Sequence, residues 1–168
     1  MRILHKNKIL PLIEATFASR KPPVVYTESN QLSECESDEV LTIIGKPWQD
    51  LTITDMESHP EVVFWLSSEA FCYYLPGFLS VGIRAAEPNL LIYHAIVQML
   101  DVHAVSEEQL DEFAGPRIRG LTIQELAVVE KWLWWLSAQT ACKIEGDKIM
   151  RAIETVEMIL QVRNRRNQ

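Results

Sequence analysis

Apolar residues recur along most of the chain at intervals of three and four positions, the spacing that places them on one face of an α-helix. The longest stripe lies in residues 147–164. Only residues 24–27, Val-Val-Tyr-Thr, have the β-branched and aromatic character of a short extended segment. The pattern predicts an all-α, single-domain bundle of about six to seven helices spanning residues 1–168. Candidate helical segments lie at residues 9–19, 34–44, 54–59, 68–84, 89–101, 106–114, 122–141 and 147–164.

Several helix starts carry the capping-box pattern, in which a Ser or Thr caps the first turn and an acid or amide three residues later returns the hydrogen bond. Glycines and prolines occupy the gaps between the predicted helices, where they end a helix or turn the chain. Pairs that fit the capping box and precede an apolar stripe are Ser33 with Glu36, Thr54 with Glu57, Ser106 with Gln109, and Thr122 with Glu125.

Residues 65–79 combine a helix start with a cluster of aromatic side chains. Ser67 is a suitable N-cap, because its hydroxyl can accept a hydrogen bond from the first turn. Phe71, Tyr74 and Phe78 follow at positions i, i+3 and i+7, which places them on one helical face. This face is expected to lie in the core, with the Tyr74 hydroxyl bonded to a buried partner.

Pro76 and Tyr73 distinguish this segment from a simple core helix. Pro76 has no N–H to donate and disfavours helical geometry at the preceding residue, so we expect a kink or a restart there. Successive helical residues are about 100° apart, so Tyr73 is expected to point away from the stripe that contains Tyr74. Tyr73 is therefore a candidate binding residue, because exposed tyrosines often anchor interfaces.

The predicted helix at residues 122–141 contains more tryptophans than one face can bury. Trp132 and Trp135 widen its apolar stripe, whereas Trp134 projects from the other side. Trp134 therefore either packs against a neighbouring helix or contributes to a protein interface. It is the second candidate binding residue, and a homodimer is one hypothesis for the partner.

Composition supports one soluble helical domain. The chain has 168 residues, is 48% apolar and contains only six glycines, which suits a packed helical core better than a turn-rich β fold. No uncharged apolar run reaches the roughly 18 residues of a spanning helix, so no membrane association is expected. Cys35, Cys72 and Cys142 are far apart and lack C-x-x-C spacing, which favours a reduced, cytoplasmic protein.

Charge is concentrated in one part of the chain. The net charge is −7, which disfavours binding to nucleic-acid phosphates. Residues 28–69 hold ten carboxylates against a single lysine. Glu36, Asp38 and Glu39 in this region are candidate contacts for a basic partner, and a solvated surface is the simpler interpretation.

No catalytic or metal-binding pattern is recognisable. Glycine-rich phosphate loops, the G-x-S-x-G elbow and H-E-x-x-H are missing from the sequence. Cys72 is expected to be a small buried hydrophobe. Neither histidine set supplies three dependable metal ligands, so no metal or cofactor is predicted. These sets are Asp55 with His59, and His94 with Asp101 and His103.

Three segments together resemble a known family: Pro47-Trp48-x-x-Leu51, residues 65–79, and Leu121-Thr122-x-x-Glu125 leading to Trp132-Leu133. They resemble a family of uncharacterised bacterial proteins, a domain of unknown function with a Leu-Ser-Pro-Glu-Ala-Phe-x-Tyr-Tyr-Leu-Pro motif. Residues 65–79 match that motif except at Ser68, where the family usually has proline, and at Gly77, where alanine is more usual. The resemblance implies no established activity, cofactor or catalytic residue.

These observations favour a small noncatalytic, cytoplasmic binding or interaction protein. One alternative is an acidic neutralising protein, similar to an immunity protein or an inhibitor, that covers a basic partner with residues 28–69. Another is a small enzyme or ligand binder with a pocket near Tyr73, Tyr74 and Trp48.

Overall fold

The computed structural model describes residues 6–28, 32–102 and 109–167. All regular structure in these ranges is helical, which confirms the predicted all-α class. The described residues form nine α-helices and one 3-10 helix, more than the six to seven predicted, because short helices such as α4 and α7 leave little periodicity in the sequence. The elements are α1 (Lys6–Phe17), α2 (Glu34–Leu41), η1 (Trp48–Asp50), α3 (Ile53–Ser58), α4 (Val62–Trp65), α5 (Ser68–Ala85), α6 (Leu91–Leu100), α7 (Ala114–Arg119), α8 (Ile123–Ser137) and α9 (Gly146–Arg166).

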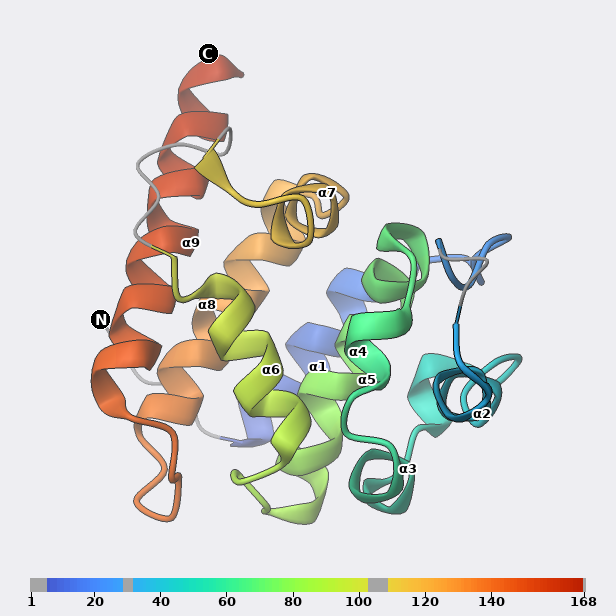
Figure 1. Cartoon of the computed structure of the whole chain (residues 1–168). Helices are drawn as coiled ribbons and strands as arrows, with labels where there is room; N and C mark the ends of the chain where they lie inside the picture. Colours follow the sequence, from blue (N-terminus) through green and yellow to red (C-terminus); the bar gives the residue numbers. More distant parts are fainter. Residues whose placement is uncertain (1–5, 29–31, 103–108, 168) are drawn as a thin grey trace.

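Helices α1, α5, α6, α8 and α9 form the main body of the fold. Helix α9 packs along α8 and against α6, and α1 lies between α8 and α5 (Figure 1). The short helices α2, α3 and α4 lie on the side of the molecule away from α9 (Figure 1). This arrangement gives α5 neighbours on several sides and accounts for the burial of its residues 70–83. No helix within the described ranges combines the length and apolar character needed to cross a membrane.

Helix α5 is continuous through Pro76, so the alternative that the helix restarts at this position is wrong. Proline removes one intrahelical hydrogen bond, but burial on all sides supplies enough packing to keep the helix intact. Gly77 allows a close approach to η1, because a Cβ at this position would lie 2.5 Å from the Trp48 carbonyl oxygen. The glycine therefore permits close packing of η1 against α5.

The core contains the aromatic stripe expected from the sequence. Phe71, Tyr74 and Phe78 are fully buried. The Tyr74 hydroxyl donates a hydrogen bond of 2.7 Å to the Ile43 carbonyl, which confirms that the buried hydroxyl has a partner. On the other side of the core, Tyr93 contacts Trp132 edge to face, with ring centroids 4.9 Å apart.

Three of the predicted helix caps are present. Ser33 with Glu36 and Thr122 with Glu125 form capping boxes, and Ser67 caps α5. At α3 the box is formed by Thr52 with Asp55, so the predicted pair Thr54 with Glu57 is wrong by two residues. The predicted pair Ser106 with Gln109 depends on Ser106, which lies outside the described residues.

Residues 110–113 are not helical, so the helix predicted at residues 106–114 is not formed there, and residues 106–108 lie outside the described ranges. The Asp111 side chain accepts hydrogen bonds from the backbone N–H groups of Phe113 and Ala114, at 3.0 and 2.6 Å. This turn delays the helix start to Ala114. Pro116, predicted to stop a helix, falls in the first turn of α7, where a missing N–H is tolerated.

The segment at residues 24–27 is not a strand. Its backbone carbonyls instead accept hydrogen bonds from the residue that caps α5. Ser67 donates its backbone N–H to the Tyr26 carbonyl at 2.8 Å and its hydroxyl to the Val25 carbonyl at 2.5 Å. These bonds hold residues 24–27 beside α4 and α5. They also place the following residue, Glu28, at the N-terminal end of α5.

Candidate binding site

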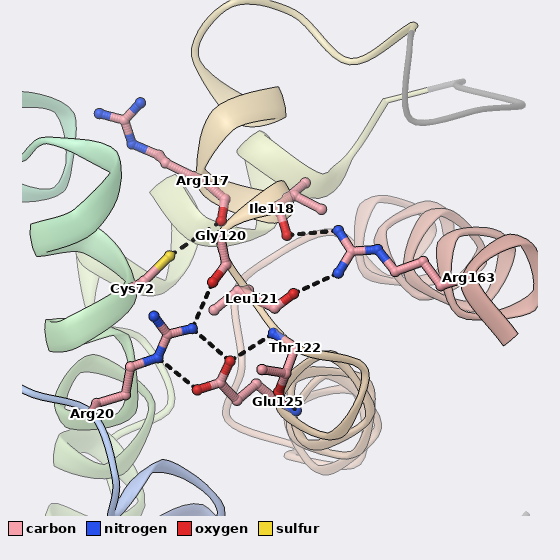
Figure 2. A network of polar contacts seen from close by, with 9 residues as sticks. All are labelled: Arg20, Cys72, Arg117, Ile118, Gly120, Leu121, Thr122, Glu125 and Arg163. Carbon is pink, nitrogen blue, oxygen red and sulfur yellow. Dashed lines mark hydrogen bonds and ion pairs between the residues drawn. The ribbon is translucent and has the colours of Figure 1, made fainter. Parts of the chain in front are cut away.

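A network of polar contacts fixes the corner between α7 and α8 (Figure 2). The Arg20 guanidinium donates two hydrogen bonds to the Glu125 carboxylate, both 2.6 Å, and a third of 2.7 Å to the Gly120 carbonyl. Arg163 on α9 donates to the carbonyls of Leu121 and Ile118. The corner is thus tied to the end of α1 and to α9, so the orientation of α7 is set by residues distant in the sequence.

Glu125 is ionised within this network. Burial alone would raise the pKa of its carboxyl, but the hydrogen bonds from Arg20 and from the Thr122 backbone outweigh burial and hold the pKa below its ordinary value. The Glu125 side chain is only 5% exposed, whereas that of Arg20 is 23% exposed. Because the two groups satisfy each other and the adjacent backbone, we assign this pair a structural role.

Cys72 packs against the same corner. Its thiol is buried and donates to the Arg117 carbonyl at 3.3 Å. Burial raises the pKa of the thiol to about 11, so Cys72 is protonated at neutral pH and lacks the thiolate character of a nucleophile. The structure confirms the predicted role as a small buried residue.

The Arg117 side chain points away from this network (Figure 2). Its guanidinium donates to two backbone carbonyls, those of Phe113 at 2.8 Å and Leu66 at 2.5 Å. It also lies over the Phe113 ring, with the guanidinium carbon 3.8 Å from the ring centroid. Arg117 is only 4% exposed, and its Nε finds no acceptor among the described residues.

Arg117 is therefore a buried cation held by neutral groups. None of the ion pairs formed between described residues includes it. Burial lowers the pKa of its guanidinium, and the more distant Glu28 carboxylate acts in the opposite direction. Burying a charge without a close counter-ion is costly, and here the two backbone carbonyls and the Phe113 ring offset part of that cost.

Arg117 lines a hollow of about 440 Å³. The hollow combines an aromatic wall with an acidic rim. In the wall, Phe64 and Phe113 contact each other with ring centroids 5.6 Å apart, and Phe64 is 39% exposed. The lining residues are Glu28, Leu32, Glu36, Phe64, Trp65, Leu66, Glu112, Phe113 and Arg117.

Local structure positions the rim carboxylates. Glu28 accepts hydrogen bonds from the Ser68 hydroxyl at 2.7 Å and the Ser68 backbone N–H at 2.9 Å, and these bonds lower the pKa of its carboxyl. Glu36 accepts from the Ser33 backbone N–H at 2.6 Å as part of the capping box of α2. Glu112 is exposed beside the wall residue Phe113. The rim thus carries three carboxylates, of which Glu28 and Glu36 are held in place by hydrogen bonds.

The predicted binding residues are not brought together. Glu36 lines the hollow, whereas Asp38 is exposed on α2 and Glu39 is half-buried there, with one carboxylate oxygen buried. Tyr73 is only 6% exposed and packs against Tyr74 with ring centroids 4.9 Å apart. A partner could reach Tyr73 only if this packing opened.

Trp134 is half-buried and packs against the core. Its indole Nε1 is buried and has no acceptor in the part of the chain that the structure describes. The hypothesis that Trp134 contributes to a homodimer stays a prediction.

The sequence interpretation missed the residues that form the hollow. Phe64 and Trp65 belong to the short helix α4, and Arg117 and Phe113 flank the start of α7. One signal was present: Ala114, Ile118 and Leu121 have helical apolar spacing, and Arg117 occupies the same face. A lone arginine within an apolar stripe indicates a buried charge.

The groups at the hollow are carboxylates, one guanidinium and aromatic faces, which together bind charged and planar groups. Among the described residues, His, Cys, Asp and Glu do not gather in threes that could hold a metal ion. Asp55 instead pairs with Lys46 and Asp101 with Arg151, each at 2.6 Å. His103 lies outside the described residues.

Fold and site together define an all-helical protein with a charged, aromatic-walled hollow. Residues 6–158 match a family of unknown function, DUF6714, and because the match covers most of the chain, the protein belongs to this family. The sequence resemblance to a domain of unknown function is thereby confirmed. No curated protein and no solved structure matches the chain.

Proposed function

We propose that this chain is a noncatalytic, cytoplasmic binding protein whose hollow between α2, α4 and α7 receives a basic segment of a protein partner. The observation that carries this proposal is the placement of three carboxylates, Glu28, Glu36 and Glu112, around one aromatic-walled hollow. A cationic side chain entering the hollow meets negative charge at the rim and aromatic faces in the wall. Both attract a cation.

Long-range charge supports the same partner. Residues 28–69, which contribute two of the three rim carboxylates, hold ten acids and one lysine. Such a surface attracts a basic partner at a distance and accelerates encounter, while the hollow supplies the close contacts. The proposal therefore includes the neutralising role as one biological use of the site.

The enzyme or ligand-binder alternative has less support. The three side chains that would line its pocket, Trp48, Tyr73 and Tyr74, are all buried. Their burial favours the hollow at Arg117 as the place where a partner binds.

Reversing the charge at Glu112 tests the proposal. The probe is a pool of synthetic tetrapeptides that contain one Lys or Arg with the other positions randomised, and binding is measured by calorimetry at low salt. Glu112→Lys should weaken binding on the order of tenfold, since it replaces attraction with repulsion at the rim, and the difference should shrink as salt rises. Glu112 is exposed and outside the helices, so the change spares the core.

The matched control is Asp38→Lys, which makes the same charge change at an exposed residue outside the hollow. We expect a much smaller effect. An equal loss in both variants would indicate a diffuse acidic surface in place of the hollow, and binding unaffected by Glu112→Lys would refute the proposal.

A further inference from the structure

We infer that the hollow recognises the carboxyl-terminal end of a basic peptide, with the terminal carboxylate on Arg117 and the cationic side chain at the acidic rim. This inference rests on the proposed function and specifies the partner group that the same site accepts. It is carried by the position of a buried guanidinium that has no close ion-pair partner, at a hollow whose rim has the opposite charge.

Arg117 has unused capacity for an acceptor. A guanidinium has five N–H donors, and the carbonyls of Phe113 and Leu66 are its two acceptors among the described residues. The Nε–H has none. Backbone carbonyls are neutral, so they satisfy hydrogen bonds without compensating the buried charge. A carboxylate that reaches the partly buried Nη1 side of the guanidinium does both, because it accepts a hydrogen bond and carries the opposite charge.

The rim excludes a simple anion as the preferred occupant. Glu28, Glu36 and Glu112 would repel phosphate or another multiply charged anion before it reached Arg117. A ligand that carries a cation close to its carboxylate is attracted both by the rim carboxylates and by the Arg117 guanidinium. A carboxyl-terminal Lys or Arg has these two groups on one residue.

The wall fits a peptide better than a single amino acid. The hollow of about 440 Å³ is partly open to solvent, so a residue bound in it can continue into a longer chain. Trp65 also lines the hollow, and its buried indole Nε1–H has no acceptor in the described ranges. The exposed face of Phe64 offers an apolar contact to preceding residues.

Two matched tetrapeptide pools test the inference. Both have Lys or Arg fixed at the last position and the other positions randomised; one has a free carboxyl terminus and the other is amidated. Peptides retained by the immobilised full chain are quantified by mass spectrometry, with free L-arginine as a further arm. We expect the free-acid pool to bind at least about tenfold more tightly than the amidated pool, because a charge-assisted pair with Arg117 is lost on amidation.

The outcomes separate the two proposals. Equal affinity of the two pools, or tighter binding of the amides, would overturn the carboxylate assignment and leave the acidic-rim function standing. Binding of neither pool would overturn both. Free L-arginine binding as tightly as the free-acid peptides would overturn the peptide assignment.

A protein variant links the preference to Arg117. In Arg117→Gln the ratio of free-acid to amide affinity should fall to about one, with folding checked by circular dichroism. Arg119→Gln makes the same change at an exposed arginine of the same helix and should keep the ratio. If Arg117→Gln does not fold, the comparison of the two pools on the unaltered protein still decides the inference.

Discussion

Replacing Glu125 with alanine is expected to lower the free energy of unfolding by about 3 kcal/mol. The carboxylate receives two hydrogen bonds from Arg20 and one from the Thr122 backbone. Its removal leaves the guanidinium without its counter-ion and the first turn of α8 without its capping box. We expect the lower end of the range for a broken buried pair, because Arg20 is partly exposed and water can solvate it.

Chemical denaturation of the two proteins measures this loss. Glu154→Ala is the matched control, since Glu154 is exposed on the long helix α9 and should change stability by less than about 0.5 kcal/mol. A loss below about 1 kcal/mol in Glu125→Ala would contradict a stabilising role for the Arg20–Glu125 ion pair.

The same pair should make stability depend on pH. The pKa of Glu125 is lower in the folded protein than its ordinary value of 4.5. Its contribution is therefore complete above the ordinary pKa and is lost as pH falls through the lowered, folded value. The stability difference between the protein and Glu125→Gln should shrink as pH is lowered from 6 through this window, whereas a constant difference would contradict the pKa assignment.

Gly82→Ala is expected to destabilise the protein by about 2 kcal/mol, although alanine is the better helix former. A Cβ at this position would lie 2.5 Å from both the Glu87 carbonyl oxygen and the Tyr93 hydroxyl. Moving either group out of the way would cost free energy. The hydroxyl accepts from the Gly82 backbone N–H at 3.0 Å and donates to the Leu79 carbonyl at 2.8 Å. The clash should outweigh the propensity gain of roughly 1 kcal/mol.

Gly146→Ala provides the control for this substitution, because nothing lies within 4 Å of a Cβ at Gly146. Thermal and chemical denaturation should show no loss of stability there. A Gly82→Ala protein as stable as the unaltered one would mean that the α5–α6 contact tolerates a methyl group.

Local features of the fold could be predicted from the sequence. Ser67 and Thr122 cap their helices because the relevant hydrogen bonds reach only three residues along the chain. The stripe of Phe71, Tyr74 and Phe78 is likewise set by helical geometry and is fully buried. The helical class follows from such short-range rules.

Features that depend on tertiary packing could not be predicted. Pro76 suggested a break, but neighbours on every side of α5 keep the helix continuous. Tyr73 lies off the main stripe and is nevertheless buried, because η1 packs on that part of α5.

The candidate site also depends on tertiary structure. Its residues come from the segments around Glu28, Glu36, Trp65 and Arg117, which are separated by up to 89 positions in the chain. Charge density pointed to the acidic region, and only the fold shows which of its carboxylates surround one hollow.

The most direct test of a binding hollow is the response of the Trp65 indole N–H signal in ¹H–¹⁵N NMR spectra during titration with the free-acid tetrapeptide pool. Trp65 lines the hollow, whereas Trp132 is fully buried against Tyr93 and serves as an internal control. We predict that the Trp65 signal shifts progressively to saturation while the Trp132 signal stays in place. Saturable binding that leaves the Trp65 signal unchanged would contradict the account.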